Sequence, residues 1–205
     1  MGYDFNKWRE NYDRFSYKEQ QSEYNIIYEA GPVQRSFHLP SVKEFLLQCK
    51  PSVVLEIGGW DGGLASEILF DNSFDFIHCW YNFEICEEAV KRGLKNIRYF
   101  PLIPETWVWE IELPNADVLI ASHFIEHIKV KQLKQVISKL PESIQFVFLQ
   151  APLEENGDDI SWQNYYGSHI LEVGWKQVEL IMENKGFKGS LINSEVRVFS
   201  KKSKA

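Results

Sequence analysis

The sequence has few cysteines, no long apolar run and no apolar amino terminus. Its three cysteines, Cys49, Cys79 and Cys86, lack metal-ligand spacing and are odd in number, so we expect buried thiols rather than disulfides. No apolar run approaches the roughly 18–20 residues that a membrane helix needs. The amino terminus is polar and aromatic, unlike a signal peptide. These absences predict a cytoplasmic protein with no membrane partner.

Basic residues are also scarce, with 22 Lys and Arg against 29 Asp and Glu, a net charge of -7. Proteins that bind nucleic acid usually present a basic face to the phosphates. The only basic cluster here is Lys201, Lys202 and Lys204, which we expect to be a solvated end. The charge therefore disfavours nucleic acid and favours a small-molecule substrate, with a peptide second; a homodimer stays open.

Apolar residues make up 44% of the 205 residues and aromatic residues 15%, which is ample for one buried core. We divide the chain into an aromatic-rich segment over 1–38 and a main domain over 39–205. In the first segment Phe5, Trp8, Tyr12 and Phe15 have helical spacing, and Gly31-Pro32 breaks the chain after it. Two interpretations remain open: a helix packed on the domain, or a lid over a substrate pocket.

From Leu39 onward, predicted strands and helices alternate. The strands are expected at 52–57, 74–80 (extending toward Phe83), 96–100, 117–122 and 144–149, with two antiparallel pieces at 188–193 and 195–200. The helices are expected to open at Pro40-Ser41, and to cover 64–69, 86–94, 130–140 and 173–185. This alternation predicts helices around a mostly parallel sheet, with ligands bound at the carboxyl edge where the strand order reverses.

A glycine-rich turn follows the first predicted strand, in Leu55-Glu56-Ile57-Gly58-Gly59-Trp60-Asp61-Gly62-Gly63. Glycines let the backbone turn sharply and let a ligand lie against bare main chain. Glu84 ends the second predicted strand, about 20 residues farther on. A carboxylate at this position can accept hydrogen bonds from both hydroxyls of a ribose. The turn and the acid together predict a nucleoside-containing ligand.

These segments resemble the class I methyltransferases that use S-adenosylmethionine. Glu56 to Gly62 resembles their first motif, and Glu84-Ile85-Cys86 resembles the stretch after their second strand. The segment Ala116 to His127 is similar to their fourth strand and the Glu-His after it, and Gly174 to Phe187 to their late helix. The resemblance spans roughly residues 40–200. It implies an α/β, three-layer Rossmann-like sandwich with a mostly parallel seven-stranded sheet and an antiparallel C-terminal hairpin.

The resemblance implies S-adenosylmethionine as the cofactor and methyl transfer as the reaction. The cofactor-binding residues it implies are Glu56, Gly58, Gly59, Trp60, Gly62, Glu84, Ile85, Leu102, Ser122 and His123. Trp60 replaces the family's second glycine, and its indole is expected to flank the methionine group. The stretch after the third strand lacks the family's acid for the adenine amino group, so Leu102 and backbone are expected to hold the adenine.

His123-Phe124-Ile125-Glu126-His127 also spells the zinc-ligand pattern of inverted zincins. That pattern needs one continuous helix, whereas residues 117–122 are expected to be a strand, so we assign no metal. Instead we expect Ser122 and His123 to line the cofactor cleft, and Glu126 and His127 to begin the next helix.

Histidine suits the role of a general base near neutral pH. His123 is the first candidate and His169, in Tyr165-Tyr166-Gly167-Ser168-His169, is the second. The acidic loop 154–159 is expected to be a solvated loop that borders the acceptor site.

Two other functions remain open. One is a non-catalytic nucleoside-binding or scaffold protein, which Trp60 and the missing acid support. The other is an NAD-linked oxidoreductase, which Trp60 disfavours because a side chain at this position keeps the backbone away from the pyrophosphate.

Overall fold

The computed structural model describes residues 31–59, 63–84, 96–101, 108–156 and 173–202, with only the backbone described for 31–38, 84 and 99–101. Seven strands form one sheet in the order β3-β2-β1-β4-β5-β7-β6. The strands are β1 (Val53–Ile57), β2 (Cys79–Glu84), β3 (Ile97–Pro101), β4 (Val118–Ser122), β5 (Phe146–Gln150), β6 (Phe187–Leu191) and β7 (Val196–Lys201).

The first five strands pair in parallel, and β7 runs antiparallel to both β5 and β6. This confirms the predicted mostly parallel sheet with an antiparallel C-terminal hairpin. The insertion of β7 between β5 and β6 was not predicted, since the sequence indicated only that the last two strands pair with each other. The strand order reverses between β1 and β4, because the chain moves outward to β3 and then returns to the other side of β1.

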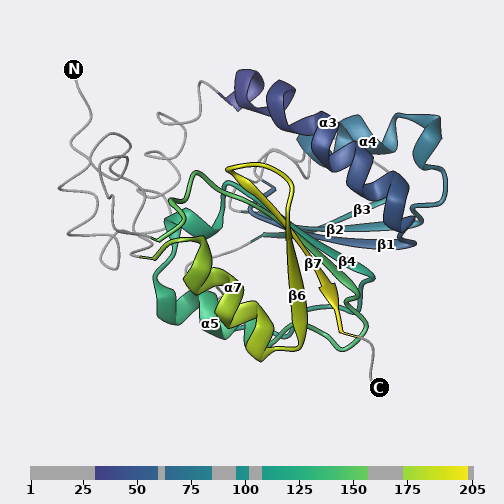
Figure 1. Cartoon of the computed structure of the whole chain (residues 1–205). Helices are drawn as coiled ribbons and strands as arrows, with labels where there is room; N and C mark the ends of the chain where they lie inside the picture. Colours follow the sequence, from purple (N-terminus) through teal and green to yellow (C-terminus); the bar gives the residue numbers. More distant parts are fainter. Residues whose placement is uncertain (1–30, 60–62, 85–95, 102–107, 157–172, 203–205) are drawn as a thin grey trace, which may run out of the picture.

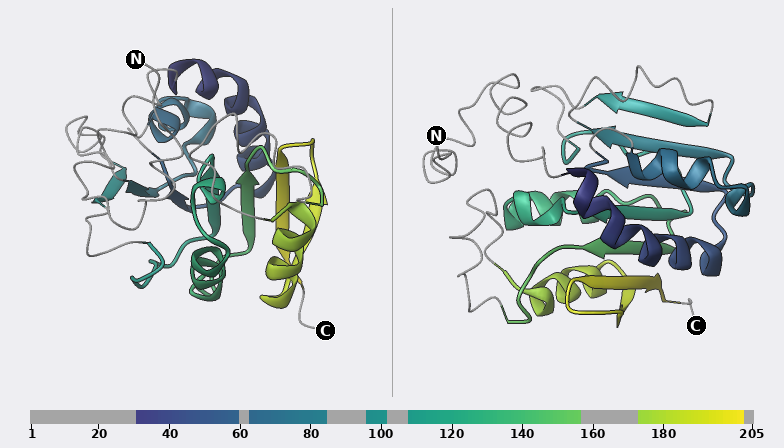
Figure 2. Two further views of the ribbon diagram at one scale, coloured as in Figure 1. Left: turned by 90° about the vertical axis from the view of Figure 1, so that its left-hand side faces the viewer. Right: turned by 90° about the horizontal axis from the view of Figure 1, so that it is seen from above.

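Helices cover both faces of the sheet (Figures 1 and 2). On one face lie α3 (Gly31–Cys49) and α4 (Gly63–Leu69), and on the other lie α5 (Val130–Ser138) and α7 (Trp175–Asn184). The α5 helix begins with Lys129 N–H donating to Gln132 Oε1 at 2.7 Å, which satisfies one of the backbone donors at the helix start. The α7 helix is followed by Gly186 at φ 94°, a left-handed conformation that favours glycine.

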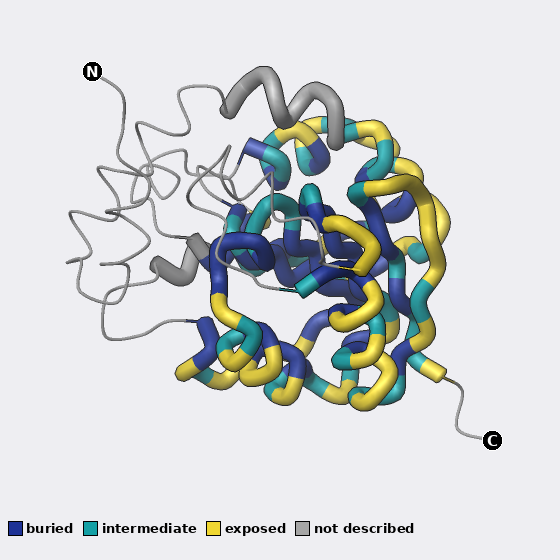
Figure 3. Tube along the Cα trace, turned by 60° about the vertical axis from the view of Figure 1, so that its left-hand side comes forward, coloured by how far each residue is buried: buried dark blue, intermediate teal, exposed yellow. Residues whose placement is uncertain are grey.

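The core has two layers because successive residues of a central strand point to opposite faces of the sheet. Tube colouring places the buried strands between more exposed helices and turns (Figure 3). The face under α3 and α4 buries Val54, Trp80, Val118, Ile120, Phe148 and Val196 against Val42, Phe45 and Ile68. The face under α5 and α7 buries Leu55, Ile57, Phe83, Leu119, Val147 and Phe199 against Leu133, Ile137, Trp175 and Val178.

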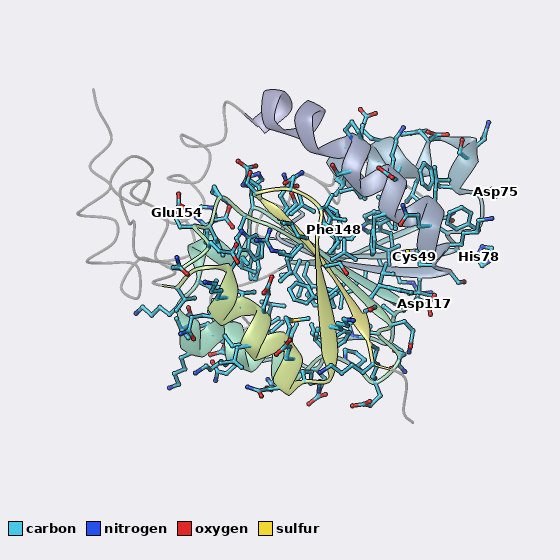
Figure 4. All side chains as sticks on the ribbon, viewed as in Figure 1. Cys49, Asp75, His78, Asp117, Phe148 and Glu154 are labelled. Carbon is cyan, nitrogen blue, oxygen red and sulfur yellow. The ribbon has the colours of Figure 1, made fainter. Side chains whose placement is uncertain are left out.

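The parallel strands all run toward one edge of the sheet (Figure 4). Cys49, His78 and Asp117, which precede β1, β2 and β4, lie at one end of the molecule, and Glu154, which follows β5, lies at the other. At the first end Asp117 Oδ2 accepts hydrogen bonds from the backbone of Ser52 and Val53 at 2.8 and 2.9 Å. The loops that follow β1, β2, β4 and β5 therefore start from the opposite, carboxyl edge.

Three predicted element boundaries are wrong. The first helix begins at Gly31 rather than at Pro40, which lies inside α3. Residues 72–74 form a 3-10 helix (η2, Asn72–Phe74) instead of a strand. Asp71 caps it, because its side chain accepts a hydrogen bond from Ser73 N–H at 3.0 Å. Because this turn buries Phe74 and Ile77 without any strand, β2 begins only at Cys79. Glu126 and His127 likewise form a separate 3-10 helix (η4, Ile125–His127), and α5 begins at Val130.

The cysteines differ in part from the prediction. Cys49 and Cys79 are free thiols, as expected, but both are only partly buried. Burial nevertheless raises the pKa of the Cys49 thiol to about 12. Cys86, the helix expected over 86–94 and the aromatic segment over residues 5–15 lie outside the described residues. In the part of the chain that the structure describes, no helix combines the length and apolar character of a membrane crossing.

Candidate active site

The glycine turn begins at the carboxyl end of β1. Gly58 has φ 78°, the left-handed region that side chains disfavour, and its N–H donates to Phe83 O at 2.9 Å. This hydrogen bond holds the turn against the end of β2. The sequence prediction of a sharp, glycine-dependent turn at this point is therefore confirmed for Gly58.

Protein side chains occupy the space that the missing Cβ atoms leave. A Cβ on Gly58 would lie 2.9 Å from the Cβ of Phe124, and one on Gly59 would lie 2.7 Å from Cγ and Nδ2 of Asn82. The first contact joins the β1 turn to the β4 turn, and the second joins it to β2. The two glycines thus let three strand ends pack closely, a role that the sequence did not indicate.

Polar side chains lie directly beneath this turn, on the face under α3 and α4. Glu56 in β1 and Asn82 in β2 are register partners, and both are buried, at 3% and 0% exposure. The Glu56 carboxylate accepts a hydrogen bond from Trp80 Nε1 at 2.8 Å. The Asn82 amide has no hydrogen-bond partner for either Oδ1 or Nδ2 among the described residues. Burying an amide without hydrogen bonds costs about 1–3 kcal/mol of folding free energy, so a ligand at the adjacent turn is a candidate partner for it.

The carboxyl end of β4 places Ser122 and His123 beside the end of β5. Ser122 Oγ donates to Gln150 Oε1 at 3.1 Å, and His123 N–H donates to Gln150 O at 2.9 Å. His123 has φ 51°, which is uncommon for a residue other than glycine. The left-handed backbone ends the strand and turns the chain toward η4. The predicted location of both residues at the strand end is confirmed.

His123 forms a close pair with Glu126. His123 Nδ1 lies 2.9 Å from Glu126 Oε1, and the same oxygen lies 3.9 Å from Nε2 of His127. The Glu126 side chain is fully buried, whereas that of His123 is 19% exposed. Burial lowers the pKa of His123, but the hydrogen bond and charge of Glu126, with the charge of Glu195, outweigh this and raise it.

This geometry does not provide the continuous helix that the zinc interpretation requires. Residues 118–122 are a strand, His123 is left-handed and 125–127 are a 3-10 helix, so the two histidines do not share one α-helical face. No group of three or more His, Cys, Asp or Glu side chains among the residues that the structure describes could hold a metal ion.

The segment after β5 is anchored by Arg197 of β7, which is buried at 3% exposure. Its Nη2 lies 2.7 Å from Glu155 Oε2, its Nε lies 3.0 Å from Glu179 Oε1, and its guanidinium lies 4.8 Å from the ring centroid of Trp175. Glu154, Glu155 and Asn156 are exposed, as expected for the acidic loop. Glu155 is in addition paired with the buried Arg197, which the sequence did not indicate.

Several predicted site residues lie outside the described residues: Trp60, Gly62, Ile85, Leu102 and His169. Glu84 is the last residue of β2, as expected, with only its backbone described. The structure brings together Gly58, Gly59, Ser122 and His123 at neighbouring strand ends. It adds Asn82, Phe124 and Gln150, which sequence reasoning missed. The structure also pairs His123 with Glu126. The only sequence signal for this pair is their spacing of three residues, which suits one helical turn.

No protein-family model and no curated protein matches the sequence. Solved structures do match its fold. The methyltransferase domain of bacterial CtHen1 is 21% identical, with a TM-score of 0.59 over 80% of this chain and 97% of that domain. An O-methyltransferase family protein from Burkholderia thailandensis is 10% identical, with a TM-score of 0.70 over 92% of this chain and 62% of that one.

Human N-acetylserotonin methyltransferase, solved in complex with S-adenosylmethionine, is also similar. It is 14% identical, with a TM-score of 0.58 over 88% of this chain and 59% of that protein. At these identities the likeness concerns the fold. Together with the strand order and the antiparallel β7, it shows that this chain has the Rossmann-like fold of S-adenosylmethionine-dependent methyltransferases.

Proposed function

We propose that this chain is an enzyme that transfers a methyl group from S-adenosylmethionine to a small-molecule acceptor. The observation that carries the proposal is the meeting of three strand ends where the strand order reverses. The glycine turn ends β1, Glu84 ends β2, and His123 with Glu126 follows β4. Open α/β sheets bind their ligands at this kind of switch point.

Residues at these strand ends fit such a cofactor. The left-handed Gly58 gives a tight turn at the end of β1, and we assign the ribose hydroxyls to Glu84, the last residue of the neighbouring β2. The buried amide of Asn82, beside Gly59, offers donors and an acceptor that no described residue uses. We assign the remaining cofactor contacts to Trp60, Gly62, Ile85 and Leu102, as the sequence predicts.

The cofactor, when bound, supplies an electrophilic methyl group on a sulfonium. An acceptor atom would take this methyl group as the carbon–sulfur electron pair is left on sulfur. Positioning supplies much of the rate in such a displacement. His123 accepts the proton that a hydroxyl or amine acceptor loses, and His169 is the second candidate for this role.

The acceptor class rests on charge. With a net charge of -7 and its basic cluster confined to residues 201–204, the chain is poorly suited to a polyanionic substrate. The exposed acids Glu154 and Glu155 follow β5 and border the proposed acceptor side. These features favour a small neutral or cationic acceptor, with a peptide second, and we also propose a cytoplasmic location.

Calorimetric titration of the whole chain with S-adenosylmethionine, S-adenosylhomocysteine and NAD tests the proposal. We expect both sulfur nucleosides to bind and NAD not to bind, and we expect Glu84→Ala to weaken binding at least tenfold. Glu183→Ala is the matched control, because Glu183 is an exposed acid on α7. Binding of NAD alone would point to the oxidoreductase, and binding of none of the three to a scaffold.

A further inference from the structure

We propose that Glu126 is a positioning residue that fixes the His123 imidazole with its proton on Nδ1 and its lone pair on Nε2. The catalytic use of that lone pair rests on the proposed function; the pairing itself does not. Nothing in the sequence assigns this role to Glu126, which the sequence predicts only as a residue at the start of a helix.

The distance and the chemistry of the two groups define the tautomer. His123 Nδ1 lies 2.9 Å from Glu126 Oε1, an ordinary hydrogen-bond length. An ionised carboxylate only accepts hydrogen bonds, so the ring nitrogen that faces it carries the proton. A neutral imidazole has one N–H, and Nε2 is then the basic atom. A base that activates a reacting group is commonly oriented by a third group, and here Glu126 would orient His123.

The backbone makes this pairing rigid. The His123 N–H is held by Gln150 O at 2.9 Å, and its left-handed φ of 51° redirects the chain into η4. In η4 the His127 N–H donates to Phe124 O at 3.0 Å, which fixes the turn that carries Glu126. The two side chains are therefore presented by backbone that is hydrogen-bonded on both sides.

Two further ionisable groups lie near the His123–Glu126 pair. The carboxylate is fully buried, and His127 Nε2 lies 3.9 Å from the same oxygen that faces His123. Glu195, in the turn before β7, adds a second negative charge that acts on His123. A buried carboxylate is costly unless it is paired and hydrogen-bonded, and the hydrogen bond from His123 to Oε1 offsets part of that cost.

Nitrogen-15 NMR of the histidine side chains in the full chain, recorded from pH 5 to pH 9, tests the proposal. In the unsubstituted protein we expect the neutral His123 ring to be the Nδ1–H tautomer. In Glu126→Gln, which keeps the side-chain volume but removes the charge, we expect a weaker preference for this tautomer and a fall of the His123 titration midpoint on the order of one pH unit. His78, exposed at the opposite edge of the sheet, is the internal reference, and its signals at each pH should be the same in both proteins.

An Nε2–H tautomer in the unsubstituted protein would overturn the proposal without any variant. So would an unchanged midpoint and tautomer in a folded Glu126→Gln protein. If Glu126→Gln does not fold, the tautomer of the unsubstituted chain still decides. Failure of S-adenosylmethionine to bind would instead refute the proposed function, and the two outcomes are distinguishable because the NMR titration needs neither cofactor nor acceptor.

Discussion

The side-chain amide of Asn82 occupies the space in which a Cβ on Gly59 would lie. The ideal Cβ would be 2.7 Å from both Cγ and Nδ2 of Asn82, closer than real Cβ contacts come. Because Asn82 belongs to β2 and is fully buried, it cannot simply swing into solvent. The identity of residue 59 is therefore coupled to that of residue 82.

Gly59→Ala should lower the free energy of unfolding by about 1–3 kcal/mol, because the added methyl group overpacks a buried site. Adding Asn82→Ala should restore part of this loss, with a coupling energy of about 0.5–3 kcal/mol between the two positions. Urea denaturation of the two single variants and the double variant gives this coupling.

The matched control for this cycle is Gly186→Ala. Gly186 also needs glycine, at φ 94°, but a Cβ there would meet nothing within 4 Å. The destabilisation caused by Gly186→Ala therefore comes from backbone conformation alone, and Asn82→Ala should not reduce it. Simple additivity of Gly59→Ala and Asn82→Ala would show that the amide does not fill the Cβ site.

Asn82→Leu tests whether the buried amide is retained for a ligand rather than for stability. Its Oδ1 and Nδ2 have no partner among the described residues, so an apolar side chain of similar size removes an unsatisfied group. We expect the free energy of unfolding to stay the same or to rise by up to about 1–3 kcal/mol. We also expect affinity for S-adenosylhomocysteine to fall, as measured by calorimetry.

Trp80→Phe is the contrasting variant, because it removes a donor that is in use. The indole of Trp80 donates to buried Glu56 at 2.8 Å, so its loss takes a hydrogen bond from a buried carboxylate. We expect destabilisation of roughly 2–4 kcal/mol from the lost hydrogen bond and the lost volume. Equal destabilisation by Asn82→Leu would mean that the amide is bonded in the folded chain.

The sequence was sufficient to predict the fold because each central strand is a short apolar run that a turn ends. Val53 to Ile57 and Val118 to Ser122 are buried on both faces, which gives the near-continuous apolar pattern of parallel strands. The pattern failed around residues 74–78, where Phe74 and Ile77 are buried by a capped turn. Apolar spacing alone does not distinguish such a turn from a strand.

The site was less predictable, because its contacts join residues that are distant in the chain. The positions of Gly58, Ser122 and His123 followed from strand ends, which local sequence indicates. Contacts such as Asn82 with Gly59 depend on sheet register, and a single sequence without aligned relatives does not fix which strands are neighbours. The resemblance to methyltransferases gave the order of elements, but not which side chains fill the turn.

The raised pKa of His123 predicts a specific pH dependence of stability. The folded-state pKa lies above the ordinary value of 6.5, so this histidine's contribution is fully present below that value. The contribution is lost as the pH rises through the folded pKa. Urea denaturation at several pH values should therefore show that His123→Gln removes part of the decline in stability above about pH 6.5.

His78→Gln is the control for this titration, because His78 is exposed and lies at the other edge of the sheet. It should not reproduce the effect of His123→Gln. The opposite sign, with His123→Gln removing a rise in stability above neutral pH, would mean that burial of the imidazole outweighs the Glu126 carboxylate.

Arg197 and its partners give a prediction about the wall of the proposed acceptor site. Arg197 is buried, donates to Glu155, Glu179 and the Asn193 carbonyl, and lies over Trp175. Arg197→Met should therefore lower the free energy of unfolding by about 2–4 kcal/mol, since it leaves polar groups without their donors. Arg197→Lys should recover only part of this loss, because an ammonium lacks the planar fork that spans two carboxylates.

Glu155→Gln distinguishes local anchoring of the segment after β5 from the global free energy of unfolding. The Glu155 side chain is 52% exposed, so water screens its ion pair and the global cost should stay below about 1 kcal/mol. Because Glu155 links the segment after β5 to β7, amide hydrogen exchange should nevertheless increase locally at residues 153–156. Exchange that is unchanged there in both Glu155→Gln and Arg197→Met would show that the backbone bonds of Trp175 and Lys176 to Glu154 and Glu155 suffice to hold this segment.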